Sequence, residues 1–338
     1  MNASDSTAVR LAVTMGDPRG IGPEIVLKAL RNAALPDARL LVLGDGGVLR
    51  ATGDLLGLPM HLSTGAVPAA NAEEARLVQV GEFPVAELEP GRPDARSGRA
   101  SLDYVEEAVR MALDGRVDAI VTGPINKEAI GAAGSPFAGH TEMLAALTGA
   151  RRPVMLLVSD ELRVALVTTH LALRDVPEAL RGKDIAAVAE ALSDGLTRFF
   201  DIGAPRLAVC GLNPHCGDGG RFGDEEARIV APAVQRAREA GVDLDGPKPA
   251  DTVFVQARNG DYDAVLALYH DQGMIPVKLD GLAHVVNVTL GLPFVRTSVG
   301  HGTAYDIAGS GRADESSLVQ AIGLAARMVR AARREEAR

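Results

Sequence analysis

Three of the seven histidines stand in polar, turn-like sequence just after short apolar runs. They are His170, His215 and His270. The carboxyl ends of parallel strands meet at one edge of an α/β sheet, so we expect these imidazoles to converge. Three neutral imidazoles suit a divalent ion such as Zn²⁺ and leave positions open for a substrate. The pattern predicts a metal site, with Asp271 holding the tautomer of His270. The alternative is that each histidine is a singly hydrogen-bonded side chain at a strand end.

A second group of polar residues suits an anionic ligand. His140 and Thr141 follow a glycine at the start of a helical run, where backbone amides, an imidazole and a hydroxyl can hold a phosphate or carboxylate. The alternative for Thr141 is a simple N-cap. Lys278, Asn287 and Arg296 are single polar residues within apolar sequence. A lone ammonium is costly to bury without an anion, and a guanidinium can bind a phosphate or carboxylate with two hydrogen bonds. The alternative for each is a salt bridge.

Two glycine-rich segments are candidates for a nucleotide site. Residues 15–24, MGDPRGIGPE, follow a predicted strand and open a predicted helix, but their glycine spacing is not the dinucleotide fingerprint. A tight strand-to-helix turn explains this segment equally well. Residues 299–309, VGHGTAYDIAG, form a loop of small residues that could wrap a nucleotide, although spacing alone does not establish that role.

The composition excludes several classes of protein. With roughly 150 residues per domain, 338 residues predict two domains. A net charge of −9 argues against a nucleic-acid partner. No segment approaches the roughly 18 apolar residues that a membrane helix needs. Cys210 and Cys216 fit neither paired zinc motifs nor a disulfide scaffold. We therefore expect a cytoplasmic enzyme that acts on a small molecule, without a membrane partner.

The elements that position these residues alternate along the chain. Short apolar runs bounded by Gly, Pro or Asp alternate with stretches of helical period, which predicts an α/β fold with a largely parallel or mixed sheet. The weakly patterned region up to residue 96 is expected to hold short or edge strands. The predicted strands are residues 11–15, 39–44, 118–122, 154–159, 163–169, 206–211, 263–269 and 285–290, and the predicted helices are residues 23–32, 99–113, 177–200, 224–240 and 315–334.

The motifs together resemble one known family. The segments GDPRGIGPEI, GPINKEAI, GHTEML, VTTHLAL, GLNPHCGDGG, YHDQG and HGTAYDIAG occur in the order found in the 4-hydroxythreonine-4-phosphate dehydrogenase family and span nearly the whole chain. The resemblance implies a fold similar to isocitrate and isopropylmalate dehydrogenases, with two α/β domains and an active-site cleft between them. We assign residues 1–125 with 285–338 to the first domain and residues 126–284 to the second. It also implies a homodimer whose metal site is shared, with His270 supplied by the partner subunit.

The resemblance also assigns roles to individual residues. It implies NAD-dependent oxidative decarboxylation of a 4-phosphorylated 3-hydroxy acid, with NADP as an alternative cofactor and Zn²⁺, Co²⁺ or Mg²⁺ as the metal. Lys278 is the candidate for proton transfer or charge balance, and His140 and Asp271 are the other expected catalytic residues. The implied metal ligands are His170, His215 and His270; the substrate contacts are His140, Thr141, Lys278, Asn287 and Arg296; the cofactor loop contains His301, Gly302, Thr303, Ala304 and Asp306.

Departures from the family pattern bear on the substrate. Biosynthetic members, which convert 4-(phosphooxy)-L-threonine to 3-amino-2-oxopropyl phosphate and CO₂, commonly read DQGLPVLK and HMGTEE where this chain reads DQGMIPVK and RFGDEE. Both segments are nearer a branch that converts 4-phospho-D-threonate or 4-phospho-D-erythronate to dihydroxyacetone phosphate and CO₂. Members of that branch usually have His at the position that Met274 occupies in this chain. Gly300 stands where an Asp commonly precedes the HGT segment. The alternatives are a dihydrodiol-acid dehydrogenase of the same family and a catalytically silent paralogue that binds a phosphorylated ligand.

Overall fold

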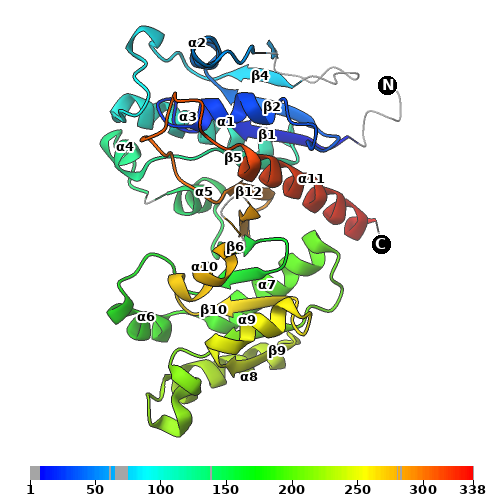
Figure 1. Cartoon of the computed structure of the whole chain (residues 1–338). Coiled ribbons are helices and arrows are strands. Elements are labelled where there is room, and N and C mark those ends of the chain that lie inside the picture. Colours follow the sequence, from blue (N-terminus) through cyan, green and yellow to red (C-terminus); the bar gives the residue numbers. More distant parts are fainter. Residues whose placement is uncertain are drawn as a thin grey trace. The chain divides into compact units, whose positions relative to one another are not determined.

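The chain folds into two α/β units, drawn in Figure 1. The computed structural model describes residues 8–60, 62–64, 75–137, 139–279, 281 and 284–337. Unit 1 comprises Met1–Arg151 and Leu292–Arg330, and unit 2 comprises Arg152–Gly291 and Ala331–Arg338. No helix within the described ranges has both the length and the apolar content needed to cross a membrane.

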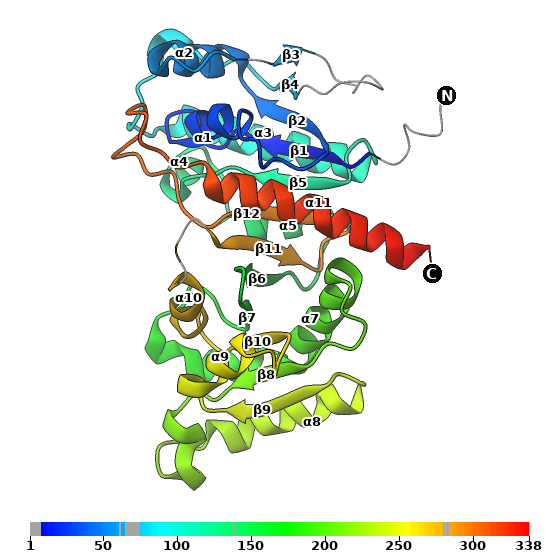
Figure 2. The same cartoon turned by 45° about the vertical axis from the view of Figure 1, so that its right-hand side comes forward.

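Unit 1 is built on strands that are parallel to their neighbours, in the order β3-β4-β2-β1-β5-β12. Strands β1 and β5 are buried along nearly their whole length, as expected for parallel strands covered on both faces. The strands are β1 Arg10–Thr14, β2 Arg39–Gly44, β3 Ser63–Thr64, β4 Arg76–Gln79, β5 Ala119–Thr122 and β12 Val295–Val299. Figure 2 shows them with the helices α1 Gly22–Ala29, α2 Gly46–Leu56, α3 Ala95–Leu113, α4 Lys127–Ala132, α5 His140–Thr148 and α11 Ser316–Glu336. A short helix, η2, spans Val85–Glu87.

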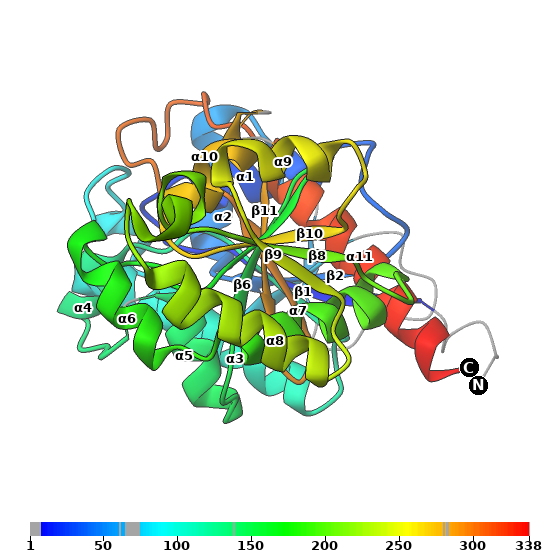
Figure 3. The same cartoon turned by 90° about the horizontal axis from the view of Figure 1, so that it is seen from below.

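Unit 2 has a mixed sheet in the order β11-β6-β7-β10-β8-β9. Strand β6 is antiparallel to β11 and β7, whereas β7, β10, β8 and β9 are parallel. Helices α9 and α10 lie on one side of these strands and α7 and α8 on the other (Figure 3). The strands are β6 Val154–Val158, β7 Arg163–Leu166, β8 Leu207–Cys210, β9 Leu244–Lys248, β10 Ala264–Ala267 and β11 Val286–Leu290. The helical segments are η3 Leu173–Asp175, α6 Val176–Gly182, α7 Ile185–Phe200, η4 Pro214–Gly220, η5 Glu226–Val230, α8 Ala231–Glu239, α9 Ala250–Arg258 and α10 His270–Lys278.

Each unit has its own apolar core. In unit 1, residues such as Leu41, Val105 and Ile120 form a fully buried cluster between the sheet and α3. In unit 2, Leu166 and Val265 belong to a second buried cluster. Each unit therefore has the separate hydrophobic core that a domain requires.

The predicted strands are confirmed, but several helices differ from the prediction. Residues 177–200 form two helices, because Asp184 interrupts the run and caps α7 by accepting a hydrogen bond from Ala187 N at 3.3 Å. The region before residue 96 contains α2 as well as the expected short strands β3 and β4. Helix α10 was not predicted, because its sequence includes a glycine and Pro276, which disfavour helix in isolation.

The unit boundaries differ from the sequence-based assignment at Ala331–Arg338, which falls in unit 2, and in two further places. Residues 126–151 lie in unit 1, since α4 and α5 pack against the core of that unit through Ile130, Met143 and Leu144. Strand β11 lies in unit 2, where it pairs with β6. Both placements follow from long-range packing rather than from any change in local composition.

Candidate active site

Two of the predicted metal ligands lie next to each other in unit 2. His170 follows β7, and His270 is the first residue of α10, directly after the neighbouring strand β10. Their ring centroids are 5.6 Å apart. His270 Nδ1 lies 2.6 Å from Oδ1 of Asp271, the partner predicted for this ring. The contact leaves Nε2 of His270 as the nitrogen that can face a ligand.

Buried polar contacts join the strand ends that carry the histidines. The hydroxyl of Thr168 donates to Leu268 O at 2.6 Å, which joins β7 to β10. The side chain of Gln272 accepts from Leu268 N at 2.6 Å and donates to Gly211 O at 2.7 Å, which joins β10 to the end of β8. Gln272 is 8% exposed. It is a positioning residue that the sequence analysis missed, although it lies within the YHDQG segment.

His215 begins an unusual left-handed turn. The φ angles of His215, Cys216 and Asp218 are 53°, 54° and 43°. The φ angles of the glycines between and after them are positive as well. Left-handed conformations of non-glycine residues cost roughly 1–2 kcal/mol each, so the surroundings must hold this turn. Glu226, 5% exposed, accepts from Leu212 N at 2.8 Å and from Asn213 N at 2.6 Å. This buried carboxylate fixes the chain just before His215 and was also missed.

The three histidines do not form a complete metal cage in this chain. Across the described ranges, no three His, Cys, Asp or Glu side chains lie close enough together to hold a metal ion. The structure brings His170 to His270 but does not bring His215 into such a group with them. The donor chemistry of the strand ends fits a divalent ion of the zinc type, because all three candidate ligands are imidazoles.

A buried cation and a neutral imidazole form the second group, in unit 1. Arg296, in β12, is 1% exposed, and its Nη2 donates to Oγ1 of Thr122 at 2.7 Å. Burial lowers the pKa of Arg296 to about 9, so the guanidinium is still charged at neutral pH. His140 opens α5, and burial together with the nearby charge of Arg296 lowers its pKa well below the usual value of 6.5.

The His140 imidazole lacks the partner that its burial calls for. Its Nε2 is buried and has no hydrogen-bond partner among the described residues. Such an atom is costly unless a ligand supplies the partner. Thr141, the next residue of α5, is half-buried, and Gly139 rather than a side chain occupies the N-cap position. A neutral imidazole beside a buried guanidinium is suited to bind the oxygens of a phosphate or carboxylate.

Lys278 and Asn287, the other predicted substrate contacts, lie in unit 2. Lys278 is the last residue of α10 and is half-buried, while the adjacent Leu279 is 77% exposed. The ammonium is therefore not enclosed by apolar neighbours as the sequence suggested. Asn287 lies in β11, and its Oδ1 is buried without a hydrogen-bond partner in the part of the chain that the structure describes. A ligand hydroxyl or amine would satisfy that oxygen.

The two glycine-rich segments pack against each other in unit 1. Ile21 N donates to Thr303 O at 3.0 Å, and the Tyr305 hydroxyl donates to Oδ2 of Asp17 at 2.8 Å. A Cβ at Gly20 would lie 3.0 Å from Cβ of Thr303, so a side chain there would push the loop away. Residues 15–24 therefore act as a support for the candidate cofactor loop. Asp17 and Tyr305 are further residues that the sequence analysis missed.

Asp17 is fully buried at this contact. It also accepts from Arg19 N at 2.8 Å and from the Ser97 hydroxyl at 3.2 Å, and burial raises its pKa. In the loop, Thr303 is buried, and Ala304 has a φ of 42°. His301 Nδ1 lies 2.9 Å from Gly302 O, and its Nε2 is buried without a hydrogen-bond partner in the described ranges. The residues left most exposed are Gly302 and Asp306.

Known proteins share this fold and sequence over nearly their full length. Residues 37–325 match the family model described as pyridoxal phosphate biosynthetic protein PdxA. The 4-hydroxythreonine-4-phosphate dehydrogenase of Desulfosudis oleivorans is 48% identical over 320 residues, covering 93% of this chain and 94% of that protein. The D-threonate 4-phosphate dehydrogenase of Cupriavidus necator is 46% identical over 322 residues, covering 92% and 95%. The crystal structure of the Klebsiella pneumoniae 4-hydroxythreonine-4-phosphate dehydrogenase matches with a TM-score of 0.86 and 43% identity, covering 96% and 98%.

An α/β chain with relatives of this kind is a dehydrogenase, an oxidoreductase that acts on a CH–OH group. More particularly, the chain belongs to the PdxA family. The family, the α/β fold class and the dehydrogenase activity predicted from the sequence motifs are thus confirmed.

Proposed function

We propose that this protein catalyses the NAD⁺-dependent oxidative decarboxylation of a 4-phosphorylated 3-hydroxy acid. The candidate substrates are 4-(phosphooxy)-L-threonine and 4-phospho-D-threonate or 4-phospho-D-erythronate. The products would be CO₂ with 3-amino-2-oxopropyl phosphate or dihydroxyacetone phosphate, respectively. The observation that carries the proposal is the buried Arg296 guanidinium beside His140, whose Nε2 is buried without a hydrogen-bond partner among the described residues. An anionic ligand would satisfy both groups.

His170, His215 and His270 would hold the divalent metal ion. When bound, such an ion lowers the pKa of a coordinated alcohol and polarises the resulting ketone. Asp271 keeps His270 in one tautomer through the 2.6 Å contact, and Gln272 keeps the strand ends in register. The support for this assignment is the 5.6 Å approach of the His170 and His270 rings.

The remaining residues of the chain would bind the substrate and move its proton. Arg296 and His140 hold the phosphate or carboxylate oxygens, and Thr141 adds a hydroxyl at the same helix end. Asn287 accepts a hydrogen bond from a hydroxyl or amine of the substrate. Lys278 is half-buried and would have to act as the neutral amine to take up the hydroxyl proton as hydride leaves for NAD⁺; the resulting ammonium then holds the proton that the carbon regains after CO₂ is lost. The resulting β-keto acid then loses CO₂. A proton is returned to the carbon that carried the carboxylate, which gives the product ketone.

The NAD⁺ adenosine would bind the loop that contains His301, Gly302, Thr303, Ala304 and Asp306. The contacts Tyr305–Asp17 and Ile21–Thr303 hold this loop on the 15–24 segment. The Nε2 of His301 is buried without a hydrogen-bond partner among the described residues, which favours ligand binding at this loop.

Changing Tyr305 to phenylalanine should weaken NAD⁺ binding with little change in kcat. The variant loses one hydrogen bond to a buried carboxylate, which is worth about 1.5–3 kcal/mol, so the KM for NAD⁺ should rise roughly tenfold. Steady-state kinetics at saturating hydroxy acid measures this. Tyr262→Phe is the matched control, since it removes a 2.8 Å tyrosine–aspartate bond in unit 2. An unchanged KM for NAD⁺ in Tyr305→Phe would separate the loop from cofactor binding.

We further propose that the protein acts as a homodimer whose metal site is completed across the two subunits. Large exposed apolar side chains in the segments that follow His170 and His270 support this: Leu173 is 67% exposed, and Ile275 and Leu279 are 61% and 77% exposed. Exposed apolar side chains grouped near a site are typical of a protein interface. The family resemblance assigns His270 of each metal site to the partner subunit; within one chain, the His170 and His270 ring centroids are 5.6 Å apart.

A substrate panel tests the proposed reaction. Purified protein and NAD⁺ should yield NADH and CO₂ with one of the three phosphorylated acids, and none with the unphosphorylated counterparts. A chelator should abolish turnover, and Zn²⁺, Co²⁺ or Mg²⁺ should restore it. Equal turnover of phosphorylated and unphosphorylated acids would instead favour the dihydrodiol-acid type of activity. Binding of a phosphorylated acid without NADH formation would indicate a catalytically silent paralogue.

A further inference from the structure

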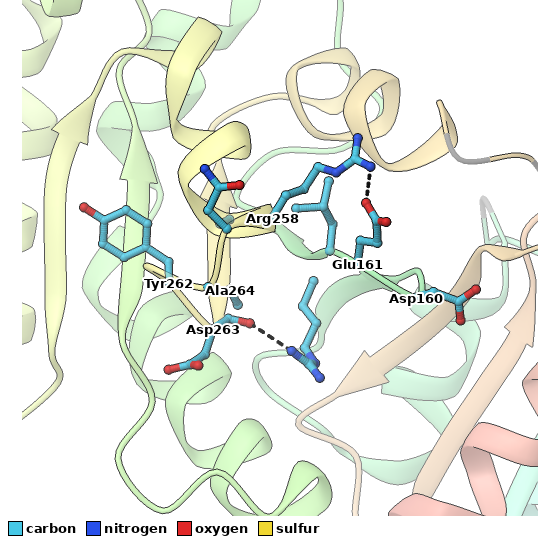
Figure 4. A pocket seen from close by; sticks show the side chains of 11 residues that line it. Asp160, Glu161, Arg258, Tyr262, Asp263 and Ala264 are labelled. Carbon is cyan, nitrogen blue, oxygen red and sulfur yellow. Dashed lines mark hydrogen bonds and ion pairs between the residues drawn. The ribbon is translucent and has the colours of Figure 1, made fainter.

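A cavity of about 540 Å³ lies in unit 2, at the amino-terminal ends of β7 and β10 (Figure 4). The candidate metal ligands follow the carboxyl ends of the same two strands, so the cavity is at the opposite edge of this sheet. Its lining comes from the turn between β6 and β7 and from the turn between α9 and β10. A volume of this size is in the range of roughly 300–1,000 Å³ that small-molecule sites occupy.

The acidic side chains of this cavity already have basic partners. Glu161 forms an ion pair with Arg258, which Figure 4 shows at the upper side of the cavity. The Asp263 carboxylate accepts from Arg206 N at 2.7 Å and from Arg206 Nε at 3.2 Å. The remaining acid, Asp160, is 74% exposed, so solvent screens its charge.

Arg163 is the lining residue whose charge is not matched in this way. Its Nη1 donates to the backbone oxygen of Asp263 at 3.3 Å, and its guanidinium stands 5.4 Å from the ring centre of Phe200. Its Nε is buried and has no hydrogen-bond partner among the described residues. Burial also lowers the pKa of Arg163. The Asp263 carboxylate is engaged by Arg206, and Arg163 meets Asp263 only through its backbone oxygen, so no carboxylate among the described residues pairs directly with the Arg163 guanidinium.

We propose that this cavity binds a small organic anion, whose carboxylate or phosphate group pairs with Arg163. A planar guanidinium binds either group through two hydrogen bonds, and a partly desolvated guanidinium gains most from such a partner. Asn259, also in the lining, offers an amide to hydroxyl or carbonyl groups of the same molecule. The site belongs to unit 2 and differs from the His140–Arg296 pair of unit 1.

Titration calorimetry of the full-length protein tests the proposal, with citrate as the carboxylate probe and glycerol 1-phosphate as the phosphate probe. Arg163→Met should weaken binding of at least one probe about tenfold or more, since a hydrogen bond to a charged group is worth about 1.5–3 kcal/mol. Arg198→Met is the matched control, because Arg198 also stands over an aromatic ring but is absent from the cavity lining. His140→Ala should leave this binding event intact.

A second variant keeps the test valid if Arg163→Met fails to fold. Asn259 is the exposed C-cap residue that follows α9, so Asn259→Asp should preserve the fold while adding a carboxylate to the lining. It should weaken anion binding by a similar factor through repulsion. Binding that is lost in His140→Ala but unchanged in both cavity variants would overturn the proposal. So would the absence of any binding of both probes to the unaltered protein.

Discussion

Changing His170 to alanine should lower turnover by about 100-fold or more and release the bound metal ion. Loss of a residue that merely orients a ligand typically costs about 10–100-fold in metal affinity or activity, so loss of a ligand itself should cost at least as much. His170 is the residue to change first, because its ring already stands 5.6 Å from that of His270. Metal content measured by mass spectrometry and kcat at saturating metal report the two effects separately.

The control for this substitution is His284→Ala. His284 lies in the same unit, and its side chain is 50% exposed with Asp160 as its neighbour, so its loss should leave metal content and turnover unchanged. His215→Ala should behave like His170→Ala, which would show that the left-handed turn brings its imidazole to the ion once metal binds. Retained metal and near-normal turnover in His170→Ala would contradict the assignment of the metal ligands.

The sequence pattern was sufficient to locate the strand ends but not their mutual contacts. Apolar runs predicted β7, β8 and β10, and His170 and His270 follow the ends of β7 and β10 with their ring centroids 5.6 Å apart. The left-handed turn at His215 could not be predicted, since it depends on a buried carboxylate, Glu226, on a different helical segment. Local sequence carries no signal for such a contact.

The candidate cofactor loop shows the same limit more clearly. Its small residues were visible in the sequence, but Tyr305 bonds to Asp17, which is 288 positions earlier in the chain. Only the parallel order β1-β5-β12 in the folded sheet brings the two segments together. The glycines of residues 15–24 were open to interpretation as a ligand cradle or as a tight turn, and local sequence gave no sign that this segment contacts Thr303.

Replacing Arg296 with methionine should lower kcat/KM for the phosphorylated acid by about 30- to 1,000-fold, because truncating one member of a buried charged pair costs roughly 2–4 kcal/mol. The expected loss is large since Arg296 is 1% exposed and no solvent can replace its guanidinium. Arg296→Lys should recover only part of it, because an ammonium cannot supply the two parallel hydrogen bonds. Arg110→Met, an exposed arginine on α3, is the control for a lost surface charge.

The state of His140 gives a readout of this prediction that does not depend on turnover. Burial and the charge of Arg296 both lower the pKa of His140, so removing the charge should raise that pKa while burial still keeps it below 6.5. Nuclear magnetic resonance titration of the imidazole in the two proteins measures the change. A raised pKa together with unchanged kcat/KM would place the pair outside the substrate site. A loss of kcat/KM with unchanged competitive inhibition by inorganic phosphate would assign Arg296 to the carboxylate instead, because the phosphate group would then bind elsewhere.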